Sequence, residues 1–266
     1  MAARWLKLTV AYDGGAYSGW QFQPDKPTVQ GTLEAAWQSL TQETLRITAA
    51  GRTDAGVHAL GQVVGVVTET RLTNEDLYRG LNALLPNDVA VRKLEDVYAD
   101  FHATYDAIGK RYRYHIHNDR APSVFDRHFA WHYPQLVDAA AMHRAGQGLV
   151  GRHDFSSFET AGSERPDSIR TIHELTVVRD VGDRSDHITI DVAGDGFLYN
   201  MVRTIVGTLV EVGVGKRDES WPAEVLAAQD RRRAGQTAPP HGLFLVHVDY
   251  NGSPPPRRRK LPCHLD

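Results

Sequence analysis

The chain has 266 residues, of which 41% are hydrophobic and 24% are charged, and its mean hydropathy is -0.40. These values fit a globular protein of one large or two ordinary domains. No stretch offers the about 18 apolar residues that a membrane span requires, and residues 1–8 lack the apolar core of a signal peptide. The single cysteine, Cys263, excludes an intramolecular disulfide and a cysteine metal cage. We therefore expect a cytoplasmic protein with no membrane partner.

A formal net charge of -3 does not exclude a nucleic-acid partner, because binding depends on a local basic surface. Basic residues cluster at 110–113, 231–233 and 257–260. The last cluster follows three prolines, which favour an extended and mobile chain. We therefore expect residues 252–266 to form a basic, disordered tail.

The first part of the chain predicts an α+β unit over residues 1–107. Alternating or Val-rich runs indicate strands, and apolar residues at helical spacing indicate helices. Thr28 is a plausible N-cap for the first helix. The predicted order is strand, helix, strand, helix, strand over 6–12, 28–45, 63–67, 73–85 and 89–94.

Residues 108–251 predict a second α+β half. We expect strands at 111–117, 169–179, 187–192 and 243–250, and helices at 138–148 and 199–212. The fold class is thus α+β with two related halves, each a mainly antiparallel sheet with helices on one face. A cleft between such halves is the natural binding site.

The stretch from Gly51 to Ala59 places Asp54 between Arg52 and Gly56, just before the Val-rich strand. A scaffold usually presents reactive side chains on loops at the edge of a rigid element. Asp54 is therefore a candidate catalytic acid. The alternative is an aspartate that caps a turn or pairs with Arg52.

The strand at 110–117 combines aromatic and basic side chains. Strand periodicity puts Tyr112 and Tyr114 on one face, and Arg111, His115 and His117 on the other. Aromatic residues with basic neighbours are suited to stacking bases and holding phosphates. An edge strand with tyrosines in the core explains the pattern equally well. His115 and His117 could bind a metal, but the sequence shows no third ligand nearby, so we predict no metal.

Arg203 is the only charged residue between Asp195 and Glu211, in a predicted apolar helix. A lone cation in such surroundings is costly unless an anion meets it. Asp54 is a candidate partner, and an arginine beside it would favour the ionised carboxylate. A structural ion pair with another acid is the alternative.

Across nearly its whole length, the chain resembles the tRNA pseudouridine synthase A family. Eight motifs carry the resemblance, in the expected order. They are Tyr12 to Gly14 with Gly19 to Gln21, Thr28 to Gln30, Gly51 to Ala59, Phe101 to Ala103, Arg111 to Tyr114, Phe155 to Phe158, Gly196 to Arg203, and Ala238 to Pro240 with Asp249 and Tyr250.

The resemblance implies a cofactor-free, metal-free isomerase that converts uridine to pseudouridine in the anticodon stem-loop of tRNA, at positions 38, 39 and 40. It implies Asp54 as nucleophile, Tyr112 as the residue that stacks on the uracil and assists proton transfer, and Arg203 as the partner of the carboxylate. Arg52 would hold the flipped nucleotide or its phosphate. The family's fold is two α+β halves flanking a basic cleft, and its members act as homodimers.

Two positions depart from the family pattern. Thr104 follows Ala103 where family members commonly have arginine, and Asp195 stands where asparagine is frequent. The first puts one RNA contact in doubt, and the second adds negative charge near the proposed active-site helix.

Two other functions were considered from the sequence. A non-catalytic RNA-binding protein would not need a buried anion such as Asp54 beside Arg203. A metal-dependent hydrolase would need clustered ligands, whereas the 13 histidines are scattered along the chain. An RNA-modifying isomerase is therefore the leading hypothesis.

Overall fold

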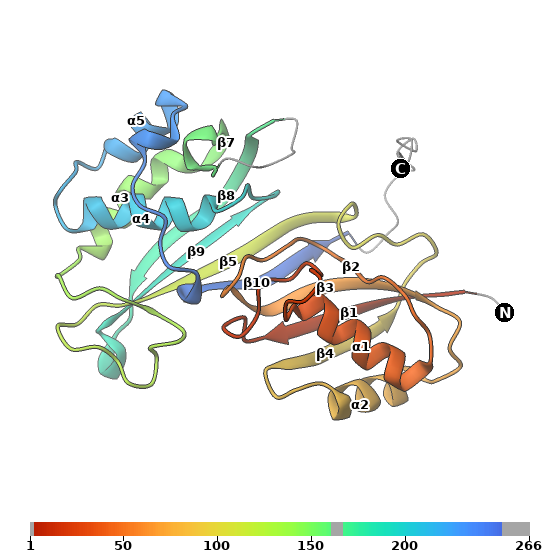
Figure 1. Cartoon of the computed structure of the whole chain (residues 1–266). Coiled ribbons are helices and arrows are strands. Elements are labelled where there is room, and N and C mark those ends of the chain that lie inside the picture. Colours follow the sequence, from red (N-terminus) through yellow and green to blue (C-terminus); the bar gives the residue numbers. More distant parts are fainter. Residues whose placement is uncertain (1–2, 161–166, 252–266) are drawn as a thin grey trace.

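The computed structural model describes residues 3–160 and 167–251. Its strands form one 10-stranded sheet with helices at both ends (Figure 1). The strands are β1 Arg4–Tyr12, β2 Thr48–Ala49, β3 His58–Thr68, β4 Val89–Asp96, β5 Ala107–His117, β6 Trp131–His132, β7 Gly151–Asp154, β8 Ile169–Arg179, β9 His187–Gly194 and β10 Leu243–Tyr250. The helices are α1 Val29–Thr41, α2 Asn74–Leu84, α3 Ala139–Gly146, α4 Met201–Gly213 and α5 Trp221–Ala228.

The main path of the sheet runs β4-β1-β3-β10-β5-β9-β8-β7. The last strand, β10, lies in the middle, antiparallel to β5 and briefly parallel to β3. Figure 1 shows α1 and α2 at the β4–β1–β3 end, and α3, α4 and α5 at the β9–β8–β7 end. The two halves therefore share one sheet, and β10 joins them.

The first helix illustrates how local signals set the element bounds. The Thr28 side chain accepts a hydrogen bond from Gly31 N, so the predicted N-cap is confirmed. Leu33 and Trp37 face the core, fully buried. The helix ends at Thr41 because Gln42 takes a left-handed conformation, with φ 63°. The predicted end at residue 45 was therefore four residues too late.

The other predicted elements are confirmed, most of them with small changes at their ends. Two strands start earlier than predicted: the strand expected over 63–67 is β3, which begins at His58, and the strand expected over 111–117 is β5, which begins at Ala107. The helix expected over 138–148 is α3 followed by a 3₁₀ turn over Gln147–Leu149. The strands expected over 169–179 and 187–192 pair antiparallel as β8 and β9. The α+β fold class and the mainly antiparallel sheet are confirmed. The predicted tail, 252–266, lies outside the described residues.

No helix in the described part of the chain is long and apolar enough to cross a membrane. The longest helices, α1 and α4, have 13 residues each. Helix α4 is buried along nearly all its length and forms part of the core of the second half.

Helix α4 approaches the segment at 236–238 very closely, and Gly207 permits this. A Cβ at Gly207 would lie 1.8 Å from the carbonyl oxygen of Gln236. We predict that Gly207→Ala lowers the free energy of unfolding by about 2 kcal/mol or more, because backbone has to move. Urea denaturation measures this loss.

Gly65→Ala is the matched control, since its Cβ would make only ordinary contacts at 3.6 Å or more. Equal stability of the Gly207→Ala variant and the native chain would contradict the predicted close packing.

Candidate active site

The loop that carries Asp54 is fixed to the sheet by its neighbours. A turn closes where Val57 N donates to Asp54 O at 3.1 Å, and Gly56 has φ +76° within it. The Thr53 hydroxyl lies 2.8 Å from the Tyr12 hydroxyl on β1, in a buried hydrogen bond. Trp20 N donates to Thr53 O at 3.0 Å. The backbone on each side of Asp54 is therefore fixed, and its half-buried side chain is 30% exposed.

Arg203, from α4 in the second half, reaches this loop. Its Nη1 lies 3.7 Å from Asp54 Oδ2, and its side chain is only 14% exposed. The guanidinium also donates from Nε to Ala238 O and from Nη1 to Asn200 Oδ1, each at 2.7 Å. Two short hydrogen bonds thus fix Arg203 independently of Asp54. The structure brings together the acid and the cation that the sequence singled out, one from each half.

The electrostatics of Asp54 balance two opposing effects. Burial raises the pKa of the Asp54 carboxyl above its ordinary value, and the charge of Arg203 opposes that rise. Among the described residues, no donor makes a hydrogen bond to either carboxylate oxygen of Asp54. A carboxylate held near a cation but not hydrogen-bonded can attack an electrophilic carbon.

Tyr112 lies on β5, two strands away from β3, and its side chain is buried. Its ring meets Phe197 edge-on, with centroids 5.2 Å apart. Phe197 lies in the segment that leads into α4, so Tyr112 packs against the approach to Arg203. The neighbouring Tyr114 donates its hydroxyl to Pro239 O at 2.8 Å. Strand β5 therefore contacts both segments that position Arg203.

Arg52 differs from the other candidate residues. Its side chain is exposed and makes no hydrogen bond or ion pair with the described residues. A Cβ built at the neighbouring Gly51 would lie 3.0 Å from Lys110 Nζ on β5. Two basic side chains therefore lie beside the start of the Asp54 loop, which suits contact with a phosphate group.

Sequence reasoning gave no role to Asn200, although it lies in the motif that ends at Arg203. Asn200 occupies the N-cap position of α4 with φ 61°, and its side chain also donates to Thr160 Oγ1 at 3.1 Å. The i, i+3 spacing to Arg203 was the available signal, because residues three apart are neighbours at a helix end.

His58, four residues after Asp54, is another buried polar residue that the sequence left without a role. Gly14 N donates to its Nδ1 at 3.0 Å, so the proton lies on Nε2, which is 3.1 Å from His241 O. Burial lowers the pKa of His58 despite the nearby Asp13 carboxylate. His58 therefore links the start of β3 to the segment before β10.

The two departures from the family pattern have local partners. The Thr104 hydroxyl donates to Ala49 O at 2.6 Å, shortly before the Asp54 loop. Asp195 Oδ1 accepts a hydrogen bond from Thr171 N at 2.9 Å, on strand β8. The Asp195 carboxylate therefore binds the backbone of the neighbouring strand and makes no ion pair with Arg203.

His115 and His117, which the sequence places on one face of a strand, have different surroundings. His115 packs edge-on against Phe244, with ring centroids 5.4 Å apart, and burial lowers its pKa to about 4. His117 instead meets Asp186 and His187, which follow it by about 70 residues. Pairing of β5 with β9 thus brings together side chains that lie far apart in the sequence.

Comparison with known proteins identifies the family of this chain. The family model described as tRNA pseudouridine synthase matches residues 8–106 and 145–251. A tRNA pseudouridine synthase A of Acetivibrio thermocellus is 45% identical over 92% of this chain and 99% of its own length. The proteins of that name from Moorella thermoacetica and Bacillus subtilis are 48% and 43% identical, again over 92% of this chain and 99% of their own. The chain belongs to the tRNA pseudouridine synthase family.

Proposed function

We propose that this protein isomerises uridine to pseudouridine in the anticodon stem-loop of tRNA, with Asp54 as its nucleophile. As a member of the family, the chain is an isomerase that acts on tRNA uridine. The choice of stem-loop, a homodimeric assembly and a cytoplasmic location are proposals that rest on the family resemblance.

The reaction requires that the bond between uracil N1 and ribose C1′ breaks, that the base turns over, and that C5 then bonds to C1′. The proton on C5 leaves at the end and N1 gains a proton, so the product is an isomer of the substrate. A carboxylate can support the broken state by a covalent bond or by close ion pairing. Asp54 suits this role because no donor among the described residues occupies its oxygens.

The target base has to leave the helical stack before Asp54 can reach it. Tyr112 would stack on the extruded uracil, and the basic side chains near Gly51 would hold the flipped nucleotide or its phosphate. Arg52 is exposed at this point, which suits a residue that meets RNA. Unstacking costs a few kcal/mol, and stacking on an aromatic ring offsets part of that cost.

The observation that carries the proposal is the 3.7 Å approach of Arg203 to Asp54 across the two halves. RNA binding alone would not require a half-buried carboxylate without a hydrogen-bond donor, because such a group would weaken attraction to phosphates. A non-catalytic RNA-binding protein, the rival hypothesis, would not require this arrangement of Asp54 and Arg203.

Asp54→Asn tests the nucleophile with little change in size. We expect the variant to bind unmodified tRNA and to lose at least about 10³-fold in the rate of pseudouridine formation, because the amide cannot act as the carboxylate does. Single-turnover assays with mass spectrometry of the RNA measure the product.

The control for this variant is Asp183→Asn, in the turn between β8 and β9. That exposed carboxylate should be dispensable, so the rate should stay at the native level. Native activity in Asp54→Asn would refute the assignment of the nucleophile.

Removal of Arg203 should change the pH dependence as well as the rate. Arg203 opposes the rise in the pKa of Asp54 that burial causes. In Arg203→Ala the pKa of Asp54 should rise further, so the acidic limb of the pH profile of kcat/KM should move to higher pH. The rate at the optimum should also fall. An unshifted acidic limb would show that Arg203 does not set the ionisation of Asp54.

Tyr112→Phe separates stacking from proton transfer. The ring remains, so we expect tRNA affinity close to the native value and a slower turnover, of about 10²-fold for a lost general acid or base. Comparison of Kd with the single-turnover rate gives both quantities. An unchanged rate would remove any role for the hydroxyl.

A further inference from the structure

A cluster of two histidines and an aspartate lies at one end of the sheet, away from Asp54. His117 ends β5 and His187 begins β9, and the two residues are direct partners in the antiparallel ladder. Asp186 immediately precedes His187. One potential ligand atom from each of the three residues lies within 4.8 Å of the others. His117 is five residues beyond Tyr112 on β5, a rise of about 16 Å along the strand.

The outward nitrogens of both histidines have oxygen partners. His117 Nε2 lies 3.1 Å from Ala121 O, and His187 Nε2 lies 3.2 Å from Asp126 Oδ2. Carbonyl and carboxylate oxygens can only accept, so each Nε2 carries a proton. A histidine that binds a metal through one nitrogen almost always donates from the other nitrogen to such a partner.

The inward nitrogens converge on one carboxylate. His117 Nδ1 is 3.2 Å from Asp186 Oδ2, and His187 Nδ1 is 2.8 Å from Asp186 Oδ1. His117 is only 6% exposed, and its Nδ1 makes no hydrogen bond within the described residues. The 2.8 Å contact of His187 is a hydrogen bond only if its Nδ1 also carries a proton. If each ring is protonated on Nε2 alone, the Nδ1 lone pairs of both histidines face a negative carboxylate. A cation between these atoms removes that repulsion.

We propose that His117, Asp186 and His187 form a zinc site. Two imidazole nitrogens and one carboxylate oxygen are a common ligand set for this ion. Ligands 2.1 Å from a tetrahedral zinc ion lie about 3.4 Å apart, which small side-chain movements would produce here. Asp126 supports His187 as an outer partner. The fourth position is left for water.

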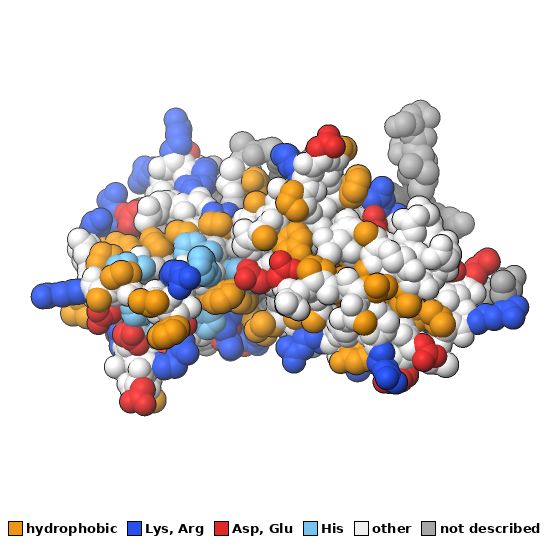
Figure 2. All heavy atoms as spheres, turned by 60° about the horizontal axis from the view of Figure 1, so that its bottom comes forward, with side chains coloured by type: hydrophobic (Ala, Val, Ile, Leu, Met, Phe, Trp, Pro, Cys, Tyr) orange, Lys and Arg blue, Asp and Glu red, His pale blue; other side chains and the backbone are white. Residues whose placement is uncertain are grey.

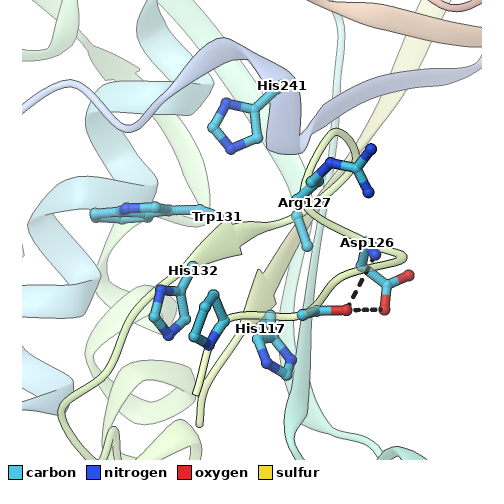
Figure 3. A pocket seen from close by; sticks show the side chains of 9 residues that line it. His117, Asp126, Arg127, Trp131, His132 and His241 are labelled. Carbon is cyan, nitrogen blue, oxygen red and sulfur yellow. Dashed lines mark hydrogen bonds between the residues drawn. The ribbon is translucent and has the colours of Figure 1, made fainter. Parts of the chain in front are cut away.

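A pocket of about 240 Å³ adjoins the cluster at His117 and at Asp126, the partner of His187. His117, Asp126, His132 and His241 are among the side chains that line it (Figure 3). Figure 2 shows histidine side chains gathered on one face of the molecule, among exposed hydrophobic side chains. The pocket therefore reaches His117, whereas Asp186 and His187 are not among the residues that line it.

The role of the site is structural. The segment 118–130 connects β5 to β6, and Asp126 and Ala121 within it contact the two histidines. Phe129 in the same segment packs against His58, with ring centroids 5.2 Å apart. Bound zinc would therefore fix this segment against both β5 and the start of β3. It takes no part in the isomerisation.

The test uses the full chain after removal of metals with a chelator. Calorimetric titration with zinc chloride should show one site per chain, and saturating zinc should raise Tm by roughly 5 °C. Titration with Co²⁺ should give the visible absorption bands of a low-symmetry, tetrahedral ion. His117→Ala and Asp186→Asn should weaken zinc binding at least about 100-fold, and Asp126→Asn by about 10- to 100-fold.

Two controls exclude other ligands. His173→Ala removes an exposed histidine of β8, and Cys263→Ser removes the only thiol, so both variants should bind zinc like the native chain. Equal zinc affinity in His117→Ala and the native chain would overturn the proposal. If His117→Ala fails to fold, the measurements on the native chain still test the proposal. The absence of Co²⁺ bands and of a zinc-dependent rise in Tm would overturn it, and would indicate two protonated histidines in place of a metal.

Discussion

The arrangement of this molecule depends on the segment that runs from residue 238 into β10. Its backbone carbonyls hold three side chains from different parts of the chain: Arg203 through Ala238, Tyr114 through Pro239, and His58 through His241. The segment then enters the sheet between β3 and β5 and joins the two halves. The same backbone thus positions the guanidinium and fixes the strand that follows the Asp54 loop.

The hydrogen bond from Arg203 to Ala238 explains how Asp54 can lie near a cation without a direct hydrogen bond from it. A bidentate ion pair would place donors on both carboxylate oxygens and reduce their nucleophilicity. Arg203 instead directs short hydrogen bonds to Ala238 and Asn200, and approaches Asp54 at 3.7 Å. Burial of both groups makes their mutual attraction stronger than it would be in water. The charge of Arg203 opposes the rise in the pKa of Asp54 that burial causes, and both carboxylate oxygens stay without a hydrogen-bond donor among the described residues.

Much of the fold could be predicted from the sequence because the signals for strands and helix starts lie within short stretches of the chain. Strand β10 was predicted with both its ends correct, and Thr28 marked the start of α1. The end of α1 was missed because the left-handed Gln42 is not a glycine, the usual residue there. Helix α5 was missed although Pro222 lies in its first turn, a known signal for a helix start.

The candidate site was harder to predict where it depends on backbone atoms and on strand order. Asp54 and Arg203 could be paired because a lone cation in an apolar helix requires an anion. The carbonyl of Ala238 has no signature in the sequence, so its bond to Arg203 could not be foreseen.

The same limit applies to the cluster of His117, Asp186 and His187, whose two histidines lie far apart in the sequence. His117 and His187 are 70 positions apart in sequence, yet the antiparallel register of β5 and β9 makes them direct neighbours. Strand pairing brings residues that are far apart in the sequence into contact. Tyr112 is paired in the same way with Leu245 on β10 and with Val192 on β9. Strand β5 therefore holds Tyr112 near its middle and His117 at its end, and strand pairing sets the neighbours of both.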